Sequence, residues 1–128
     1  MKKIFVVLVL ILGIVSAGGL AAQSGGKTIH FVSVSADGDS SQMTEFITIE
    51  VSGAGAGELK QNDITITSEE SINTWRSFRD NEYVIFEFYF DTDVSRSHEV
   101  TVTIEKQGYT VTPSSRTVLV FDGKGPAQ

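Results

Sequence analysis

Three acidic pairs in the chain have the residue types that bind a hard cation. They are Asp37 and Asp39, Glu69 and Glu70, and Asp91 and Asp93. A calcium ion takes about six to eight oxygen ligands, several of them carboxylates, so three acidic loops at one end of a domain could supply a site. Such pairs are also ordinary turn and strand-end sequences, and none has the spacing of an EF-hand loop. Calcium binding and solvated turns are therefore both open interpretations.

Three aromatic residues form a second candidate site, for a protein or a glycan: Trp75, Tyr83 and Tyr89. Exposed aromatic rings anchor protein interfaces and stack on sugars. The two tyrosines belong to an aromatic segment whose strand alternation places them on its wetter face, and Trp75 is near in sequence. The alternative is structural, with both faces of this strand covered or Trp75 filling the core.

Catalytic chemistry has few residues to draw on. The chain contains no cysteine, which excludes disulfides, thiol nucleophiles and cysteine metal sites. Both histidines, His30 and His98, lie in predicted strands, whereas a Ser-His-Asp triad needs a histidine held between a nucleophile and a carboxylate. We therefore expect no enzyme activity, no catalytic residue and no cofactor other than the calcium considered above. The alternative is a small hydrolase that uses His98 with a nearby carboxylate.

The segments that must position these residues alternate apolar and polar side chains with the period of a β-strand. They are residues 28–36, 44–52, 63–68, 69–80, 82–91, 97–106 and 109–122, the last interrupted by Pro113. Residues 69–80 fit either an irregular edge strand, which the pattern favours, or a single helical turn. Gly53–Gly57, with alternating glycines, predicts a mobile loop. The pattern predicts an antiparallel, all-β sandwich of about seven strands over residues 28–122; a small barrel is the alternative.

The organising strand is Glu82–Asp91. Its alternation places Val84, Phe86, Phe88 and Phe90 on one wholly apolar face, which we expect in the core. Burying a phenylalanine contributes roughly 1.5–3 kcal/mol, so these rings supply a large share of a small core.

The first 22 residues have the order of a secretory signal peptide. Lys2 and Lys3 precede an apolar run over residues 4–15, and small residues follow up to Ala22. The run is shorter than the about 20 residues that span a bilayer, although an uncleaved anchor is an alternative. We expect a flexible leader at 23–27, a disordered tail at 123–128, and an exported protein, periplasmic or at the cell surface, without stable membrane insertion after cleavage. Its net charge of −6 disfavours nucleic acid as a partner.

Two segments together resemble the bacterial immunoglobulin-like (Ig-like) repeat domains of exported surface proteins. Residues 59–67 resemble their step from a leucine to Asp-Ile-Thr, and residues 100–109 resemble their Val-x-Val-x-Ile strand with its closing Gly-Tyr. The similarity covers about residues 44–122. It implies an Ig-like sandwich, used in arrays as a spacer or an adhesive module, with no shared catalytic residue. This chain departs from that pattern as one short domain.

These observations together predict a non-catalytic Ig-like module that contacts a protein or glycan partner in the cell envelope. One alternative is a self-associating surface-layer or fibre subunit, joined through the edge that Pro113 marks. Another is an adhesive domain stabilised by calcium.

Overall fold

The computed structural model describes residues 26–125, so the expected signal peptide and most of the leader lie outside the described residues. Eight strands make up the fold. They are β2 (Thr28–Ala36), β3 (Phe46–Ser52), β4 (Ile64–Thr67), β5 (Ile72–Asp80), β6 (Tyr83–Phe90), β7 (His98–Ile104), β8 (Thr110–Thr112) and β9 (Ser115–Val120). Two single-turn 3-10 helices, η2 (Ala56–Glu58) and η3 (Gln61–Asp63), connect β3 to β4.

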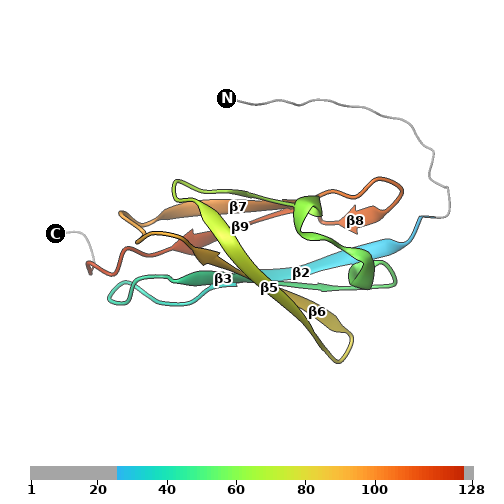
Figure 1. Cartoon of the computed structure of the whole chain (residues 1–128), viewed down its shortest axis with the longest axis horizontal. Coiled ribbons are helices and arrows are strands. Elements are labelled where there is room, and N and C mark those ends of the chain that lie inside the picture. The colour runs from blue at the N-terminus through green and yellow to red at the C-terminus, as the bar shows by residue number, and fades with distance from the viewer. Residues whose placement is uncertain (1–25, 126–128) are drawn as a thin grey trace.

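The strands form two sheets that pack face to face as a sandwich (Figure 1). The first has five strands in the order β5-β6-β3-β2-β8, and the second has three in the order β4-β7-β9. Neighbouring strands are antiparallel, except that the short β8 runs parallel to β2. The all-β sandwich predicted from the alternation is confirmed, and the eight strands within residues 26–125 agree with the predicted number of about seven.

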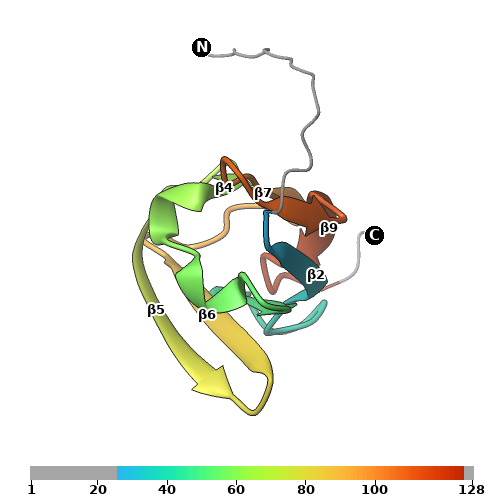
Figure 2. The same cartoon turned by 90° about the vertical axis from the view of Figure 1, so that its right-hand side faces the viewer.

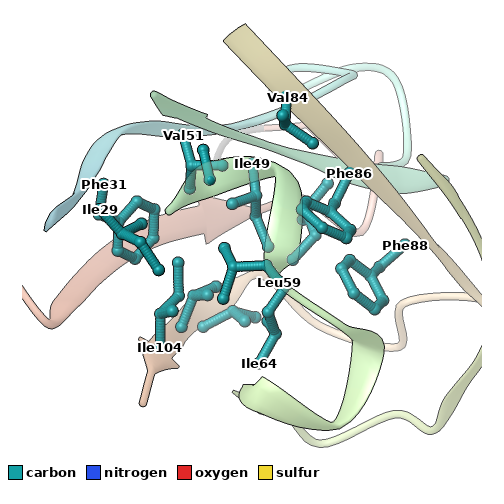
Figure 3. Close-up of a cluster of buried hydrophobic side chains, with 14 of the residues drawn as sticks. Ile29, Phe31, Ile49, Val51, Leu59, Ile64, Val84, Phe86, Phe88 and Ile104 are labelled. Atoms are coloured by element: carbon teal, nitrogen blue, oxygen red, sulfur yellow. The ribbon is translucent and has the colours of Figure 1, made fainter. Parts of the chain in front are cut away.

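The core lies between the sheets and contains the apolar face of β6 (Figure 3). Phe86 and Phe88 are 2% and 3% exposed, as the alternation predicts, and they face β-branched residues of β4 and β7. Those opposing residues are Ile64, Val100, Val102 and Ile104. Ile85 is a correction to the expectation of a wetter second face, because it is buried on that side without belonging to the core cluster.

The predicted last strand, 109–122, is in fact two strands in different sheets. β8 pairs with β2, and β9 pairs with β7. Pro113 has no N–H to donate to a ladder, and it stands where the chain changes sheet. Arg116 then reaches back across this side, where its Nε donates to the Phe31 carbonyl at 2.7 Å. The sandwich is therefore closed along the side where β2 and β9 meet.

The glycine segment 53–57 is a packed turn rather than the open, mobile loop that its composition predicts. The Gly55 N–H donates to the Thr28 carbonyl at 3.0 Å, and Ala56 is 2% exposed. A Cβ at Gly55 would lie 2.7 Å from the Tyr109 ring and 2.9 Å from Ile29. Glycine is required here for close approach.

Both ends of the described range are bound to the body. The Lys27 carbonyl accepts from the Thr110 N–H at 3.0 Å, and Lys27 pairs with Glu58. Residues 123–125, expected in a disordered tail, are held by the Gly125 N–H, which donates to the Ser40 carbonyl at 2.7 Å. Within residues 26–125, no helix has the length and apolar character needed to cross a membrane.

Truncation to alanine distinguishes the buried Phe86 from the exposed Phe78 by its effect on stability. We expect Phe86→Ala to lower the free energy of unfolding by about 3–5 kcal/mol, because it leaves a cavity in the packed core. Phe78→Ala should cost less than about 1 kcal/mol, because Phe78 is 42% exposed on an edge strand. Urea denaturation measures both. Equal losses would contradict the assignment of Phe86 to the core.

Candidate functional site

The β5–β6 hairpin extends beyond the rest of the sandwich (Figures 1 and 2). Its strands pair from Ile72 opposite Phe90 to Asp80 opposite Tyr83, and two residues make the turn. Asn81 takes a positive φ of 58° there, a conformation that asparagine tolerates better than most residues. The predicted edge strand at 69–80 is confirmed, and the helical turn is wrong.

β5 is the most exposed strand of the fold. Every residue after Ile72 is exposed, and within residues 26–125 β6 is the one strand that pairs with it. Between β4 and the start of β5 the sandwich leaves an open hollow of about 180 Å³, lined in part by Ile64, Ile72 and Phe88. The sandwich is thus closed at β2 and β9 but open at β4 and β5.

Trp75 lies on the inner face of the hairpin. It stands opposite Phe88 in the β5–β6 register, and its ring stacks at 6.1 Å from both Phe86 and Phe88. Stacked aromatic pairs stabilise by about 0.5–1.5 kcal/mol beyond their burial. Trp75 remains 39% exposed, so one side packs on the core edge while another faces solvent.

The outer face of the hairpin carries different side chains, which contact one another. Phe78 stands opposite Ile85 and shields it, and the Arg76 guanidinium lies 5.4 Å from the centre of the Phe78 ring. Arg76 Nε and the Tyr89 hydroxyl both donate to Glu87 Oε1, at 2.6 and 2.9 Å. These hydrogen bonds, first from Arg76 and then from Tyr89, lower the pKa of Glu87, while the bond to Glu87 raises the pKa of Tyr89.

The three aromatic candidates therefore do not share one surface. Tyr83 and Tyr89 are half-buried on the outer face, where Tyr89 packs on Phe46 at 5.1 Å. Trp75 is on the inner face. Phe78, more exposed than any of them, was missed by sequence reasoning, although its position three residues after Trp75 in a strand already indicated the opposite face.

The three acidic loops do come to one end of the sandwich, as the predicted strand directions require. Asp91 illustrates how that end is built: its carboxylate accepts from the Ser71 hydroxyl at 2.8 Å and from the Asn73 side-chain amide at 2.6 Å. Asp37 accepts from the backbone N–H groups of Glu45 and Phe46, at 2.7 and 2.9 Å. These carboxylates join neighbouring loops through protein donors.

The remaining acidic candidates are separately engaged or stand apart. Asp39 accepts from the backbone and hydroxyl of Ser41, at 2.8 and 3.0 Å. Glu69 pairs with Arg96, whose hydrogen bond lowers the pKa of the Glu69 carboxyl. Asp93 has no ion pair within residues 26–125. Over that range, no three histidine, aspartate or glutamate side chains converge as metal ligands would.

Glu70 and His98 form a buried pair at the same end. Their side chains are 7% and 9% exposed, and Glu70 Oε1 lies 3.5 Å from His98 Nε2. That separation is within ion-pair range, yet neither atom makes a hydrogen bond. His98 Nδ1 is 2.8 Å from the Arg96 carbonyl, which can only accept, so Nδ1 carries a proton.

This pair also bears on hydrolase chemistry. The Ser95 hydroxyl donates to Glu70 Oε2 at 3.2 Å, not to His98. A catalytic histidine has to contact its nucleophile, and here the carboxylate occupies that position. Ser95, Glu70 and His98 therefore act as a structural link between the loops that precede β5 and β7.

No protein-family model matches this chain, and comparisons with curated proteins and with solved structures gave no match.

The Arg76–Glu87 contact predicts a specific titration. Arg76→Gln removes the first cause of the lowered Glu87 pKa, so that pKa should rise toward its ordinary value of 4.5. In the wild type, the contact contributes stability above pH 4.5 that is lost as the pH falls through the Glu87 pKa. Side-chain carboxyl NMR measures the titration, with Arg79→Gln as the control. An unchanged Glu87 pKa in Arg76→Gln would contradict the contact.

The Glu70–His98 pair predicts that two substitutions of Glu70 change the free energy of unfolding by different amounts. Glu70→Gln can donate an amide N–H to His98 Nε2 and still accept from Ser95, so the free energy of unfolding should change by less than about 1 kcal/mol. Glu70→Ala removes the acceptor of the Ser95 hydroxyl and the carboxylate beside His98, and should cost about 1–3 kcal/mol. Chemical denaturation near neutral pH distinguishes them. A loss in Glu70→Gln as large as in Glu70→Ala would show that the amide does not replace the carboxylate.

Proposed function

We propose that this chain is an exported, non-catalytic Ig-like module that binds a protein partner in the cell envelope through the β5–β6 hairpin. The observation that carries this proposal is β5 itself, an edge strand with eight consecutive exposed residues. It presents an indole and a phenyl ring, Trp75 and Phe78, at 39% and 42% exposure. Large exposed aromatic residues on a rigid element are the usual anchors of protein interfaces.

The placement of the aromatic rings favours a protein over a glycan. Stacking on a sugar uses rings that lie along one face, whereas Trp75 and Phe78 point to opposite sides of the same strand. A polypeptide that pairs with the edge or wraps around it can contact both sides at once. Main-chain hydrogen bonds along an unpaired edge then add affinity that a sugar cannot match in the same way.

The strand order supports the Ig-like part of the proposal. In constant-type immunoglobulin domains, the first, second, fifth and fourth strands form one sheet and the third, sixth and seventh form the other. Here β2, β3, β6 and β5 lie together in that order, and β4, β7 and β9 form the second sheet. β8 is an addition, parallel to β2.

The remaining parts of the proposal come from separate observations. Export and an envelope location are supported by the signal-like order of residues 1–22. The absence of catalysis is supported by the Glu70–His98–Ser95 geometry, in which the Ser95 hydroxyl donates to the carboxylate rather than to the histidine. Calcium is not part of the proposed function, because the acidic loops already use protein donors.

The proposal is tested by cross-linking the exported chain in cell-envelope extracts and quantifying the proteins joined to it. The double variant W75A/F78A should lose its partner by at least about 30-fold, since truncating an interface anchor costs about 2 kcal/mol or more. Leu119→Ala is the matched control, because Leu119 is 47% exposed on β9, away from the hairpin. Equal recovery with W75A/F78A and wild type would refute a hairpin-mediated contact.

A further inference from the structure

The outer edge of β5 is an unpaired row of backbone groups. β5 pairs with β6 on one side, and within residues 26–125 no other backbone segment pairs with it. Long edge strands are templates for another strand, and proteins usually shorten, bulge or charge them. β5 has one irregularity, at its start between Ile72 and Thr74, and then continues in regular register from Thr74 to Asp80. It is an open edge of seven regularly paired residues without a proline.

The residues along this edge are complementary to themselves. Reading outward from Ser77, each aromatic residue is matched by an arginine at the same distance on the other side. Trp75 is matched by Arg79, and Phe78 is matched by Arg76. An antiparallel pair of identical strands brings such matched positions directly opposite each other, on the same face of the combined sheet.

We infer that the strand which fits this edge is β5 of a second copy of the chain, antiparallel, with Ser77 facing Ser77 on the two-fold axis. Trp75 then lies opposite Arg79 of the second copy on the inner face. Arg76 lies opposite Phe78 of the second copy on the outer face. Each contact occurs twice and joins a guanidinium to an aromatic ring, an attractive combination. The inference rests on the proposed function, because it names the partner of the same hairpin.

One of the two kinds of contact already occurs within the chain. The Arg76 guanidinium lies 5.4 Å from the centre of the Phe78 ring within one chain, so this ring accepts a cation. Arg79 makes no ion pair among residues 26–125, and its guanidinium lies near Gly57, so it has to turn toward the edge to reach Trp75 of the second copy. At the axis itself each residue meets its own copy, and serine is small and uncharged there.

Other registers use the edge less well. Centring the pair on Arg76 or Arg79 places like charges opposite each other, which is destabilising. Centring it on Phe78 places Arg76 opposite Asp80 of the second copy, but Glu87 already neutralises Arg76. That register also leaves the unpaired Arg79 opposite Ser77. Only the Ser77-centred register gives Arg79 an aromatic partner.

Charge sets how the association should respond to salt. The chain as a whole carries a net charge of −6, so copies repel one another on average. β5 carries two arginines and one aspartate, so two copies of this edge also repel each other weakly. Salt screens the long-range repulsion more than it weakens short contacts, so the association should strengthen as the salt concentration rises.

Disulfide trapping tests the register, because the chain has no cysteine of its own. Under mild oxidation of the purified exported chain, Ser77→Cys should form a covalent dimer rapidly. Phe78→Cys and Leu119→Cys should not, since their copies lie farther apart in this register. Faster dimerisation of Phe78→Cys would overturn the Ser77-centred register. Ser77→Cys that cross-links no faster than Leu119→Cys would overturn the pairing of β5 with itself.

Sedimentation equilibrium of chains without cysteine supplies the affinity. Arg79→Glu should weaken the dimer at least about tenfold, because two aromatic contacts are lost. Asp80→Ala, whose position faces Thr74 of the second copy, should leave it unchanged. A wild-type chain that stays monomeric up to millimolar concentration, in low and high salt, would overturn the inference.

The outcome separates this inference from the proposed function. If the purified chain is monomeric but W75A/F78A still loses an envelope protein that Leu119→Ala retains, the hairpin binds a different protein: the second copy is refuted and the binding function stands. If Ser77→Cys dimers form, and the chain itself is the protein recovered in a hairpin-dependent way, both are supported. If neither dimerisation nor hairpin-dependent capture occurs, both are refuted.

Discussion

Phe86 and Phe88 have to be removed from water along a strand that the second sheet covers only in part. Three strands face five, and β5, the strand beyond β6, is exposed over all but its first residue. Trp75 completes the cover by stacking on both rings from the neighbouring strand. The exposure of the Trp75 indole is thus first a consequence of the smaller, three-stranded sheet, which does not cover the whole width of the core. Its availability for binding follows from the same mismatch, because a ring that closes the edge of a core necessarily shows its other side to solvent.

A second constraint shapes the acidic end of the molecule: the backbone N–H groups of its loops need hydrogen-bond acceptors. Loops that connect strands leave N–H groups without ladder partners, and such groups must be paired when they are covered. Asp37 accepts from two of them, and Asp91 accepts from the Asn73 N–H at 3.2 Å as well as from two side chains. Carboxylates that accept such hydrogen bonds fix the loop conformation. The three acidic loops then lie at one end of the sandwich because of the strand directions, not because they share a ligand.

The sequence predicted those features that depend on local alternation. The strand at 28–36, the aromatic strand and the edge strand at 69–80 all follow from the period of two, which needs no knowledge of neighbours. Which sheet each strand joins is not local, and so the division of 109–122 between two sheets could not be predicted. The face of the sheet on which Trp75 lies could not be predicted for a related reason. The irregularity between Ile72 and Thr74 changes the alternation of β5 relative to the preceding residues.

The candidate site was harder to predict than the fold because it depends on what is missing opposite β5. A sequence shows that Phe78 and Trp75 alternate, but not that a facing strand is absent. It likewise shows His98 and Glu70 without indicating that their side chains meet at one end of the sandwich, 3.5 Å apart and largely covered. The described ends, by contrast, lie at opposite ends of the long axis, and β2 runs parallel to β8 (Figure 1). A pulling force between those ends would act along these two strands in shear. Their ladder bonds, and the Arg116 bond to Phe31, would then carry the load together instead of opening one after another.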